Sequence, residues 1–572
     1  MKKMMMPRTE LNEVLLSFRK GFLNVGLFSF FINMLALIPS IYMLQVYDRV
    51  LQSRSISTLV MLTIIMLVFY VMLGMLEVAR SKLLIRIGAQ LDMKLNDRVF
   101  VASFEKNLKH SGSNAGQAMT DLTTVRQFLT GNGLFAFFDA PWAPIYLLVI
   151  TLFSPWLGVF SLVCAIVLFS LAWLTEMVTR KPLAEAGRMA NSANTFATNN
   201  LRNAEVIEAM GMLENLKKRW LSRQLKFLSL QNEASDRAAV ISAITKSVRI
   251  AVQSLILGGG ALLVIEGSLT PGGMIAASIL LGRSLAPVEL AIGVWKQLLS
   301  ARTSYHRLEE LLQEQPPRKP GMDIPRPVGN LVVEGVSAAP PGTQMVVLKQ
   351  VGFQVASGEV IGVIGPSASG KSTLARLLVG VWPSLAGKVR LDGADVYTWN
   401  KEQLGPAVGY LPQDIELFEG TIAENIARFG DVESAKVVEA AQLAGVHEMI
   451  LRFPKGYDTP IGDGGSALSG GQRQRIGLAR AMYGNPSFVV LDEPNSNLDD
   501  VGEAALVKAV EELKRRGVTV LLITHRTSIL TVVDKLLLLV DGAVQLYGPR
   551  DQVLATIQQR QLAGRIEAPA AA

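Results

Sequence analysis

The chain has 572 residues, of which 50% are hydrophobic and 18% are charged, and its mean hydropathy is +0.32. Because about a quarter of the residues in soluble proteins are charged, this composition excludes an ordinary soluble protein, and the length predicts two or more domains. The single cysteine excludes an intramolecular disulfide, the four scattered histidines argue against a zinc site, and the formal net charge of +8 suits either nucleic acid or anionic lipid as a partner.

The first 76 residues contain two long uncharged stretches, after a basic segment over residues 1–20. Charged residues are absent from Gly21 to Tyr47 and from Ser55 to Leu76. A membrane-spanning helix needs about 20 mostly apolar residues, so each stretch predicts one span. The first stretch is too long for a signal-peptide core and lacks a small-residue cleavage site, which predicts an uncleaved span.

Four further spans are predicted between residues 127 and 282. From Gln127 to Thr175 the only charged residue is Asp139, and the uncharged run after it is too long for one helix. Ser154-Pro155 interrupts that run, which predicts a tight hairpin of two spans. The uncharged stretches 250–265 and 267–282 predict the last two spans.

The distribution of lysine and arginine predicts the orientation of these spans. Residues 77–126 carry eight of them and residues 176–249 carry twelve, whereas the short turns at 154–156 and 266–271 carry none. Basic loops favour the cytoplasmic side, so both long loops and both termini are predicted to be cytoplasmic. Basic loops beside the lipid bilayer therefore account for the positive net charge, and no nucleic-acid partner is needed to explain it.

Both long loops have helical patterns. Ala79–Leu108 and Arg188–Leu230 mix charged and apolar residues at helical spacing. We predict helices that continue well beyond the bilayer and carry contacts into the cytoplasm, joined by short turns near Gly112–Asp121 and Asn200–Met212. Two soluble helical hairpins without a coupling role are the alternative.

The composition changes at the end of this membrane half, which we place at residues 21–314. Five prolines lie between Gln315 and Pro327, which predicts a linker over residues 315–330. A soluble domain is predicted over residues 331–560, followed by a flexible tail over residues 561–572.

The soluble domain contains a phosphate-binding loop between a predicted strand (Glu359–Ile364) and a predicted helix (Thr373–Val379). Its residues match the pattern G-x-x-x-x-G-K-[ST]: they are Gly365, Pro366, Ser367, Ala368, Ser369, Gly370, Lys371, Ser372 and Thr373. Backbone N–H groups of such a loop curl around a phosphate, and the helix N-terminus adds partial positive charge. Lys371 would reach the β- and γ-phosphates, and the Ser372 hydroxyl would hold Mg²⁺. A glycine-rich turn without a ligand is the alternative, which the motifs that follow disfavour.

A second motif is the apolar strand Phe488–Asp492, which ends in two consecutive carboxylates. Asp492 suits the Mg²⁺ shell, and Glu493 suits a group that orients or deprotonates the attacking water. Taken alone, this strand could equally be a buried strand with acidic residues at its exposed end.

A third motif precedes the helical run Arg473–Met482. Ser469 can cap this helix, which leaves an open N-terminus for a phosphate. A second anion site is redundant in one ATPase domain, but it makes sense if it contacts nucleotide held by another copy of the domain. The residues that we predict to contact nucleotide here are Ser469, Gly470, Gly471 and Gln472.

In this order, the motifs resemble those of ATP-binding-cassette (ABC) ATPases over about residues 331–560. The resemblance implies that Gln413 touches Mg²⁺ and faces the membrane domain, and that His525 contacts the γ-phosphate. It implies that Ser496–Asp499 joins two active sites across a dimer, and that Ile461–Gly465 touches the membrane domain. At the position where the family usually stacks an aromatic ring on adenine this chain has Pro340, which predicts loose selectivity for the base.

The order of domains, with six spans followed by one ATP-binding cassette, is similar to that of an ABC half-exporter. The implied fold is an all-α six-helix transmembrane domain of a type I ABC exporter, fused to an α/β P-loop nucleotide-binding domain. One chain supplies one phosphate loop and one signature helix, so two composite sites imply a homodimer. The implied cofactors are ATP and Mg²⁺, and the implied activity is ATP hydrolysis coupled to transport.

Three segments narrow the resemblance to the protease and lipase exporters of type I secretion systems (PrtD-type): Phe138–Tyr146, Gly282–Glu289 and Asp492–Asp499. It implies a multi-pass protein of the bacterial inner membrane that exports unfolded polypeptides with C-terminal signals. Its partners would be a periplasmic membrane fusion protein and an outer-membrane channel. An exporter of lipids or small hydrophobic compounds is the nearest alternative, and a regulatory ABC protein that binds ATP without pumping is a third.

Two charged residues, Arg283 and Glu289, follow the uncharged stretch 267–282 on the last predicted membrane helix. Charges are tolerated where a membrane helix faces a wet cavity or leaves the membrane. The pair could line a polar translocation path, or it could form ion pairs that hold the helix in place. The last two spans reach full length only if they extend past Arg249 or Arg283.

Overall fold

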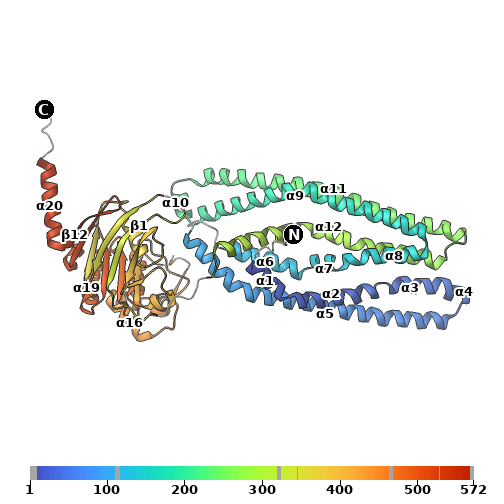
Figure 1. Ribbon diagram of the computed structural model, residues 1–572, viewed down its shortest axis with the longest axis horizontal. Helices are drawn as coiled ribbons and strands as arrows, with labels where there is room; N and C mark the ends of the chain where they lie inside the picture. Colours follow the sequence, from blue (N-terminus) through green and yellow to red (C-terminus); the bar gives the residue numbers. More distant parts are fainter. Residues whose placement is uncertain are drawn as a thin grey trace, which may run out of the picture. The chain divides into compact units, whose positions relative to one another are not determined.

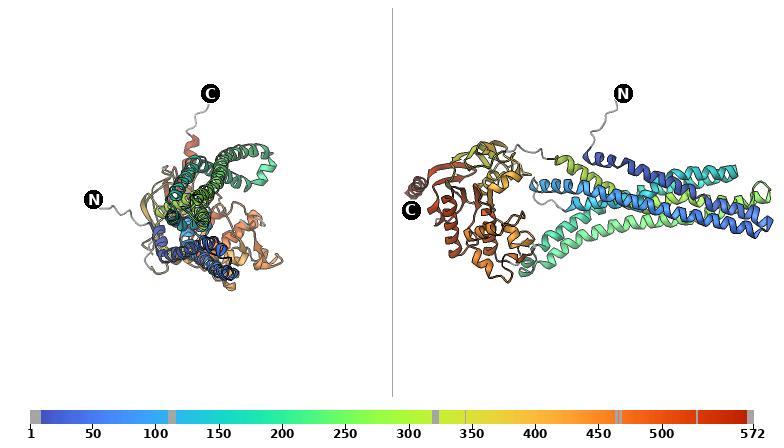
Figure 2. Two further views of the ribbon diagram at one scale, coloured as in Figure 1. Left: turned by 90° about the vertical axis from the view of Figure 1, so that its right-hand side faces the viewer. Right: turned by 90° about the horizontal axis from the view of Figure 1, so that it is seen from below.

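The computed structural model describes residues 9–109, 116–317, 324–343, 345–462, 465, 468–526 and 528–566. The chain divides between Pro317 and Arg318 into a helical unit and an α/β unit, each of which has its own core. Both units are drawn in Figure 1 and, from two further directions, in Figure 2.

Among the described residues, six helical stretches are long and apolar enough to cross a membrane, which confirms the predicted number of spans. The elements of the helical unit are α1 (Glu10–Ser17), α2 (Arg19–Leu35), α3 (Ile38–Gln45), the π-helix η1 (Val46–Val50), α4 (Leu51–Ser53), α5 (Ile56–Lys109), α6 (Gln117–Thr130), α7 (Asn132–Asp139), the 3₁₀ turn η2 (Ala140–Trp142), α8 (Ala143–Phe153), α9 (Pro155–Leu201), α10 (Ala204–Ala209), α11 (Leu213–Ile265) and α12 (Pro271–Glu314).

The helix boundaries follow the local chemistry of the chain. The predicted hairpin is found at Ser154, whose extended backbone separates α8 from α9, and Pro155 then occupies the first turn of α9. Both predicted cytoplasmic turns include residues that are helical. Gln117–Asp121 already belongs to α6, and the predicted turn over Asn200–Met212 contains the short helix α10.

The last two spans do continue past the arginines that interrupt their apolar runs, within α11 and α12. Arg249 of α11 lies 2.8 Å from Glu289 of α12, measured from Nε to Oε1. This contact favours the ion-pair alternative for Glu289. Arg283 is exposed and is not part of that pair.

A buried polar cluster fastens α2 and α5 to the end of α7. Arg80 of α5 is 6% exposed, and its guanidinium lies 3.2 Å from the carboxylate of Asp139. The Asn33 side chain of α2 donates to the same carboxylate oxygen at 2.7 Å, and the hydroxyl of Tyr146 donates to the Asn33 carbonyl at 2.9 Å. Asp139, the single charge of its long apolar stretch, is therefore paired inside the helical unit.

The described part of the α/β unit contains two main sheets. One is a six-stranded sheet with the order β12-β11-β3-β10-β9-β6, and the other is an antiparallel sheet with the order β2-β1-β4-β5. The strands are β1 (Leu331–Ala338), β2 (Leu348–Val355), β3 (Val360–Ile364), β4 (Ala386–Leu391), β5 (Ala394–Asp395), β6 (Val408–Leu411), β7 (Gly420–Thr421), β8 (Pro460–Ile461), β9 (Phe488–Asp492), β10 (Thr519–Ile523), β11 (Lys535–Val540) and β12 (Ala543–Pro549).

Helices cover the larger sheet, so its central strands are buried along their whole length, as is typical of parallel sheets. The helices of the unit are α13 (Lys371–Leu378), α14 (Lys401–Leu404), α15 (Ile422–Ile426), α16 (Ser434–Leu443), α17 (His447–Leu451), α18 (Gly470–Met482), α19 (Asp500–Arg515) and α20 (Arg550–Ile566), with 3₁₀ turns at Gly405–Ala407, Gly456–Asp458 and Ser528–Val532.

The strand register brings the loops that follow four parallel strands to one edge of the larger sheet. β6, β9, β10 and β3 are parallel neighbours, with Leu411 opposite Leu491, Ile523 opposite Asp492, and Val363 opposite Ile523. The carboxyl ends of these strands therefore meet at the same edge, where ligands bind in open α/β sheets.

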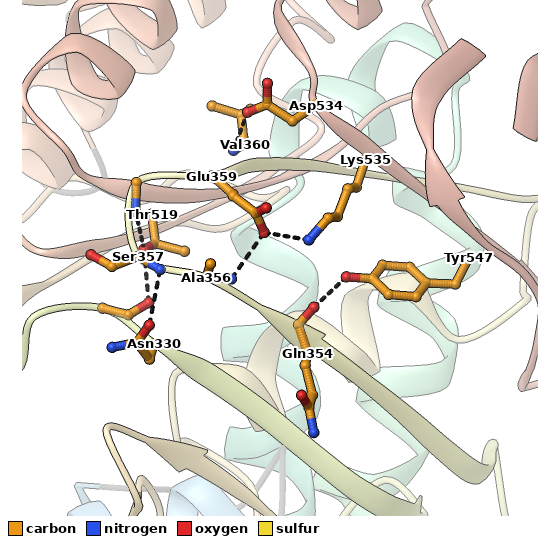
Figure 3. Close-up of polar contacts among 12 residues, drawn as sticks. Asn330, Gln354, Ala356, Ser357, Glu359, Val360, Thr519, Asp534, Lys535 and Tyr547 are labelled. Carbon is orange, nitrogen blue, oxygen red and sulfur yellow. Dashed lines mark hydrogen bonds and ion pairs between the residues drawn. The ribbon is translucent and has the colours of Figure 1, made fainter. Parts of the chain in front are cut away.

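The opposite end of β3 is held by a polar cluster around the turn that follows β2 (Figure 3). Lys535 lies 2.7 Å from Glu359, whose carboxylate also accepts the backbone N–H of Ala356 at 2.9 Å. The Ser357 N–H donates to Asn330 at 3.1 Å, and the Glu359 carboxylate raises the pKa of Lys535. These contacts tie the antiparallel sheet to the larger one, away from the phosphate loop.

Candidate nucleotide site

The phosphate loop lies where β3 ends and α13 begins. Gly370 is the residue before α13 and has a φ of 99°, in the left-handed region that favours glycine. A Cβ at this position would lie 2.7 Å from the Leu348 side chain, so the loop also has no room for a larger residue. The backbone thus requires glycine at Gly370 on both grounds.

The side chain of Lys371 lies inside the loop. Its ammonium donates to the carbonyls of Gly365 at 3.0 Å and Pro366 at 2.8 Å. Burial lowers the pKa of Lys371, and the charges of Glu493 and Asp492 oppose that shift. A phosphate that offered its oxygens to this ammonium would replace two neutral partners with charged ones, which make stronger hydrogen bonds.

Asp492 and Ser372 have the oxygen atoms that would suit a magnesium ion. Asp492 is 2% exposed, burial raises its pKa, and a hydrogen bond with the Ser372 side chain opposes that shift. Its buried Oδ1 has no hydrogen-bond partner among the described residues. An unpaired buried carboxylate oxygen is costly, so it fits a cation ligand.

The described residues contain no cluster of three or more His, Cys, Asp or Glu side chains that could hold a metal ion. A Mg²⁺ ion usually takes one or two protein oxygens and completes its shell with phosphates and water. Ser372 and Asp492 are the residues that would hold it.

The three predicted catalytic residues meet at the ends of three adjacent strands. Gln413 follows β6, Glu493 follows β9, and His525 follows β10. The Gln413 amide donates to Glu493 Oε2 at 3.1 Å, and His525 Nε2 lies 3.3 Å from Glu493 Oε1. Their separate roles toward magnesium, water and the γ-phosphate stay predictions.

Ser469 caps α18 as predicted from the sequence. Its hydroxyl accepts the N–H of Gln472 at 3.3 Å, while the Gln472 side chain accepts the N–H of Ser469 at 2.8 Å. This reciprocal capping box occupies the Gln472 side chain, for which we predicted a nucleotide contact. The N–H groups of Gly470 and Gly471 belong to the open first turn of the helix.

Sequence reasoning missed Gln474, which links α18 to the loop after β9. The side chain is 1% exposed; its amide donates to the Glu493 carbonyl at 3.2 Å, and its Oε1 accepts the Asn497 N–H at 3.0 Å. A signal was present, because Gln474 lies one turn before Leu478 on the buried stripe of α18. A polar residue on an apolar stripe marks a buried hydrogen-bonding role.

Arg428 was also missed. Its guanidinium donates to the carbonyls of Gly405, Val408, Arg480 and Ala481 at 2.8–3.1 Å. Burial lowers its pKa to about 10. Arg428 therefore fastens the start of β6 to the end of α18, and it helps to position the strand that carries Gln413.

Other predicted residues lie around this centre. Asp499 caps α19 by accepting the Gly502 N–H at 2.9 Å and also contacts Arg475 at 3.2 Å. Pro340 lies in a turn after β1, where its carbonyl accepts the Thr343 N–H at 3.1 Å. Within the predicted contact segment 461–465, residues 463 and 464 lie outside the described residues.

Comparison with known proteins gives matches over nearly the whole chain. Residues 348–496 match the family described as ABC transporter, and residues 22–285 match the ABC transporter transmembrane region. The chain is 46% identical over 545 residues to the type I secretion system ATP-binding protein PrsD of Rhizobium meliloti (strain 1021), covering 95% of this chain and 94% of the relative.

Two more distant similarities agree with this match. The toxin RTX-I translocation ATP-binding protein of Actinobacillus pleuropneumoniae is 28% identical over 551 residues, covering 94% of this chain and 77% of the relative. The structure of a bacterial Atm1-family ABC exporter with ATP bound superimposes with a TM-score of 0.81 at 22% identity, covering 97% of this chain and 99% of the other. The second similarity shows a shared fold.

Proposed function

Because this chain belongs to the ABC transporters of type I secretion systems, which couple ATP hydrolysis to transport, we propose that it exports unfolded polypeptides that carry C-terminal secretion signals. ATP hydrolysis is supported by one observation: the side chains of Gln413 and His525 both contact Glu493, next to Asp492 and the phosphate loop. The cargo part rests on the relatives, which are named for type I secretion and toxin translocation.

In the proposed mechanism, the phosphate loop binds ATP first. Lys371 exchanges the carbonyls of Gly365 and Pro366 for the β- and γ-phosphates, and the loop N–H groups donate to the same oxygens. Ser372 and Asp492 would hold Mg²⁺, which neutralises charge on the phosphates when it is bound.

Glu493 then orients the attacking water. Its carboxylate is fixed by Gln413 on one oxygen and by His525 on the other, so it cannot turn away from the sheet edge without breaking both interactions. From this position it would accept a hydrogen bond from the water and then its proton. Gln413 would also face Mg²⁺, and His525 the γ-phosphate.

Two copies of the chain would complete two sites. The N-terminus of α18 would face the γ-phosphate bound to the partner's loop. Ser469 caps this helix, and the first-turn N–H groups would point toward the phosphate. Gln474 connects this helix to the backbone of Glu493, so contact with the partner's nucleotide and the position of the water-orienting group would change together. Hydrolysis would remove the γ-phosphate and allow the two copies to separate.

We further propose that the protein resides in the bacterial inner membrane with its ATPase domain in the cytoplasm. A periplasmic membrane fusion protein and an outer-membrane channel would continue the path. The long helices α5, α9, α11 and α12 extend far beyond a bilayer core of about 30 Å, since each residue adds about 1.5 Å. They would carry the ATP-driven change to the spans.

ATP turnover in lipid vesicles tests this proposal, with the wild type compared with Glu493→Gln. A C-terminal segment of a secreted protease is added to each. The expected result is that the segment changes wild-type turnover, while the variant binds ATP and forms dimers without turnover. Turnover that responds to lipids or small hydrophobic compounds and ignores the segment would support the alternative cargo and refute ours.

A further inference from the structure

The turn that carries His525 is held from inside the domain by Thr524. This threonine directly follows β10 and is fully buried, and its hydroxyl accepts the N–H of Arg526 at 3.1 Å. Its own N–H donates to the carbonyl of Val363 on β3 at 3.3 Å. His525 therefore lies at the tip of a turn whose first residue is fastened to the larger sheet.

The other end of this turn is held by Glu503 of α19. The Glu503 side chain is 13% exposed, and its Oε2 lies 2.8 Å from the guanidinium of Arg526. Its Oε1 accepts a hydrogen bond from the hydroxyl of Ser528. One carboxylate thus contacts the first and the third residue after His525, with one oxygen for each.

The carboxylate of Glu503 is itself well placed to hold these partners. Its backbone N–H donates to the carbonyl of Asp499, the cap of α19, at 2.8 Å, so the side chain belongs to the first turn of the helix. The hydrogen bond from Ser528 lowers the pKa of Glu503, and Arg526 lowers it further against the opposing effect of burial. Glu503 is therefore charged at neutral pH, and hydrogen bonds to a charged acceptor are stronger than neutral ones.

The position of the turn decides where the imidazole of His525 lies. His525 Nε2 lies 3.3 Å from Oε1 of Glu493, the group that we propose to orient the attacking water. The backbone N–H of Glu493 donates to the carbonyl of Ile523 at 3.0 Å, so the loops after β9 and β10 are joined by backbone as well as by side chains. A shift of the turn would change the contact between His525 and Glu493.

The pair of Glu503 and Arg526 is better explained by this placement than by stability. Half of the Arg526 side chain is exposed, and ion pairs with an exposed partner usually contribute little to the stability of a domain. A displacement of about 1 Å at a reacting group, in contrast, can lower a rate about a hundredfold.

We propose that Glu503 is a positioning residue for His525, an inference that rests on the proposed role of His525 at the γ-phosphate. By fixing Arg526 and Ser528, Glu503 holds the outer end of the turn while Thr524 holds the inner end. The imidazole then stays beside Glu493 when ATP binds, instead of moving with a loose loop.

Substitutions of Glu503 test this role in the full chain. Glu503→Ala removes both side-chain contacts and places a good helix former in α19, whereas Glu503→Gln keeps an acceptor oxygen and loses the charge. The matched control is Glu511→Ala, which replaces an exposed glutamate about two turns later on the same helix. ATP turnover and the KM for ATP are measured in lipid vesicles for each variant and for His525→Ala.

We expect the turnover number to fall about tenfold in Glu503→Ala, equivalent to about 1.4 kcal/mol, and less in Glu503→Gln, with the KM for ATP within about threefold of wild type. Glu511→Ala should match the wild type. Wild-type turnover in Glu503→Ala, together with a loss in His525→Ala, would overturn the positioning proposal and leave the role of His525 intact. Wild-type turnover in His525→Ala would overturn that role and the positioning proposal with it.

Chemical modification of the histidines locates the imidazole independently of turnover. The chain has four histidines, so the reaction of each with diethyl pyrocarbonate can be followed by mass spectrometry. Without nucleotide, His525 should react faster in Glu503→Ala than in the wild type, because its contact with Glu493 is weakened. His447, whose Nδ1 lies 2.8 Å from the Tyr457 hydroxyl, should react at the same rate in both. Unchanged reactivity of His525, or an equal increase at His447, would show that any loss of turnover has a general structural cause, and either result overturns the proposal.

Discussion

Replacing Gln474 with methionine tests whether this buried side chain positions the water-orienting Glu493. Methionine has a similar length and volume, so the change removes the hydrogen bonds without opening a large cavity. It leaves the Asn497 N–H and the Glu493 carbonyl without the partners that Gln474 provides. The phosphate loop is not touched by this substitution.

The magnitude follows from two contributions. The Glu493 carbonyl keeps the N–H of Ser496 at 3.2 Å, so the Asn497 N–H is the group that loses its hydrogen-bond partner. One unsatisfied group costs about 1–3 kcal/mol, so the free energy of unfolding should fall by about that amount. Glu493 also has a φ of 49°, in a left-handed conformation that costs an ordinary residue about 1–2 kcal/mol. Without the Gln474 amide, the Ser496 N–H alone holds the Glu493 carbonyl, so Glu493 should relax and move its carboxylate away from Gln413 and His525.

We expect the turnover number of Gln474→Met to fall at least tenfold, which corresponds to about 1.4 kcal/mol of transition-state stabilisation. The affinity for ATP should stay within about twofold of wild type, because Lys371 and its loop are intact. Phosphate release over time measures turnover, and equilibrium binding of a fluorescent ATP analogue measures affinity.

The matched control is Gln442→Met on α16, where the glutamine side chain is exposed. It should leave both quantities unchanged. A Gln474→Met protein that is less stable but hydrolyses ATP at the wild-type rate would refute the positioning role. Equal reductions in affinity and turnover would point to general unfolding of the domain.

Three other substitutions or conditions have definite expected outcomes. Arg428→Met should lower the unfolding free energy by roughly 3–5 kcal/mol in denaturant titrations, because four partly buried carbonyls would lose their hydrogen bonds from the guanidinium. Arg80→Gln should lower the melting temperature in detergent more than Arg80→Gln combined with Asp139→Asn, because the single change leaves a buried charge unpaired. Burial lowers the pKa of Lys371 and bound phosphate should raise it again, so ATP affinity should weaken as the pH rises through the alkaline range, with proton uptake on binding detectable by calorimetry in two buffers.

The phosphate loop and the cap of α18 could be predicted from the sequence because their chemistry is local. The loop from Gly365 to Lys371 is contiguous, and the capping box joins residues only three positions apart, Ser469 and Gln472. The spans could be predicted for the same reason, since each is a continuous apolar run. For Arg283 and Glu289 an ion pair was one of two open alternatives, and only the packing of α11 on α12 shows that Glu289 pairs with Arg249.

Contacts that depend on strand order could not be predicted in this way. Gln413 and Glu493 are 80 residues apart, and only the register of β6 with β9 brings their side chains to 3.1 Å. The position of Gln474 on the apolar stripe of α18 indicates a buried polar role, but its partners could not be predicted, because they are backbone groups of the loop after β9. The first cytoplasmic turn was predicted to include Gln117–Asp121, but these residues form the first part of helix α6.

The most direct test of the account is ATP-driven movement of a polypeptide by the purified protein. A fluorescent C-terminal segment of a secreted protease is added to the ATPase side of proteoliposomes, and its protection from added protease is followed over time. We predict that protection accumulates with ATP in the wild type and fails in Glu493→Gln. Equal protection in the variant, or ATP-driven movement of lipid with none of the segment, would contradict the account.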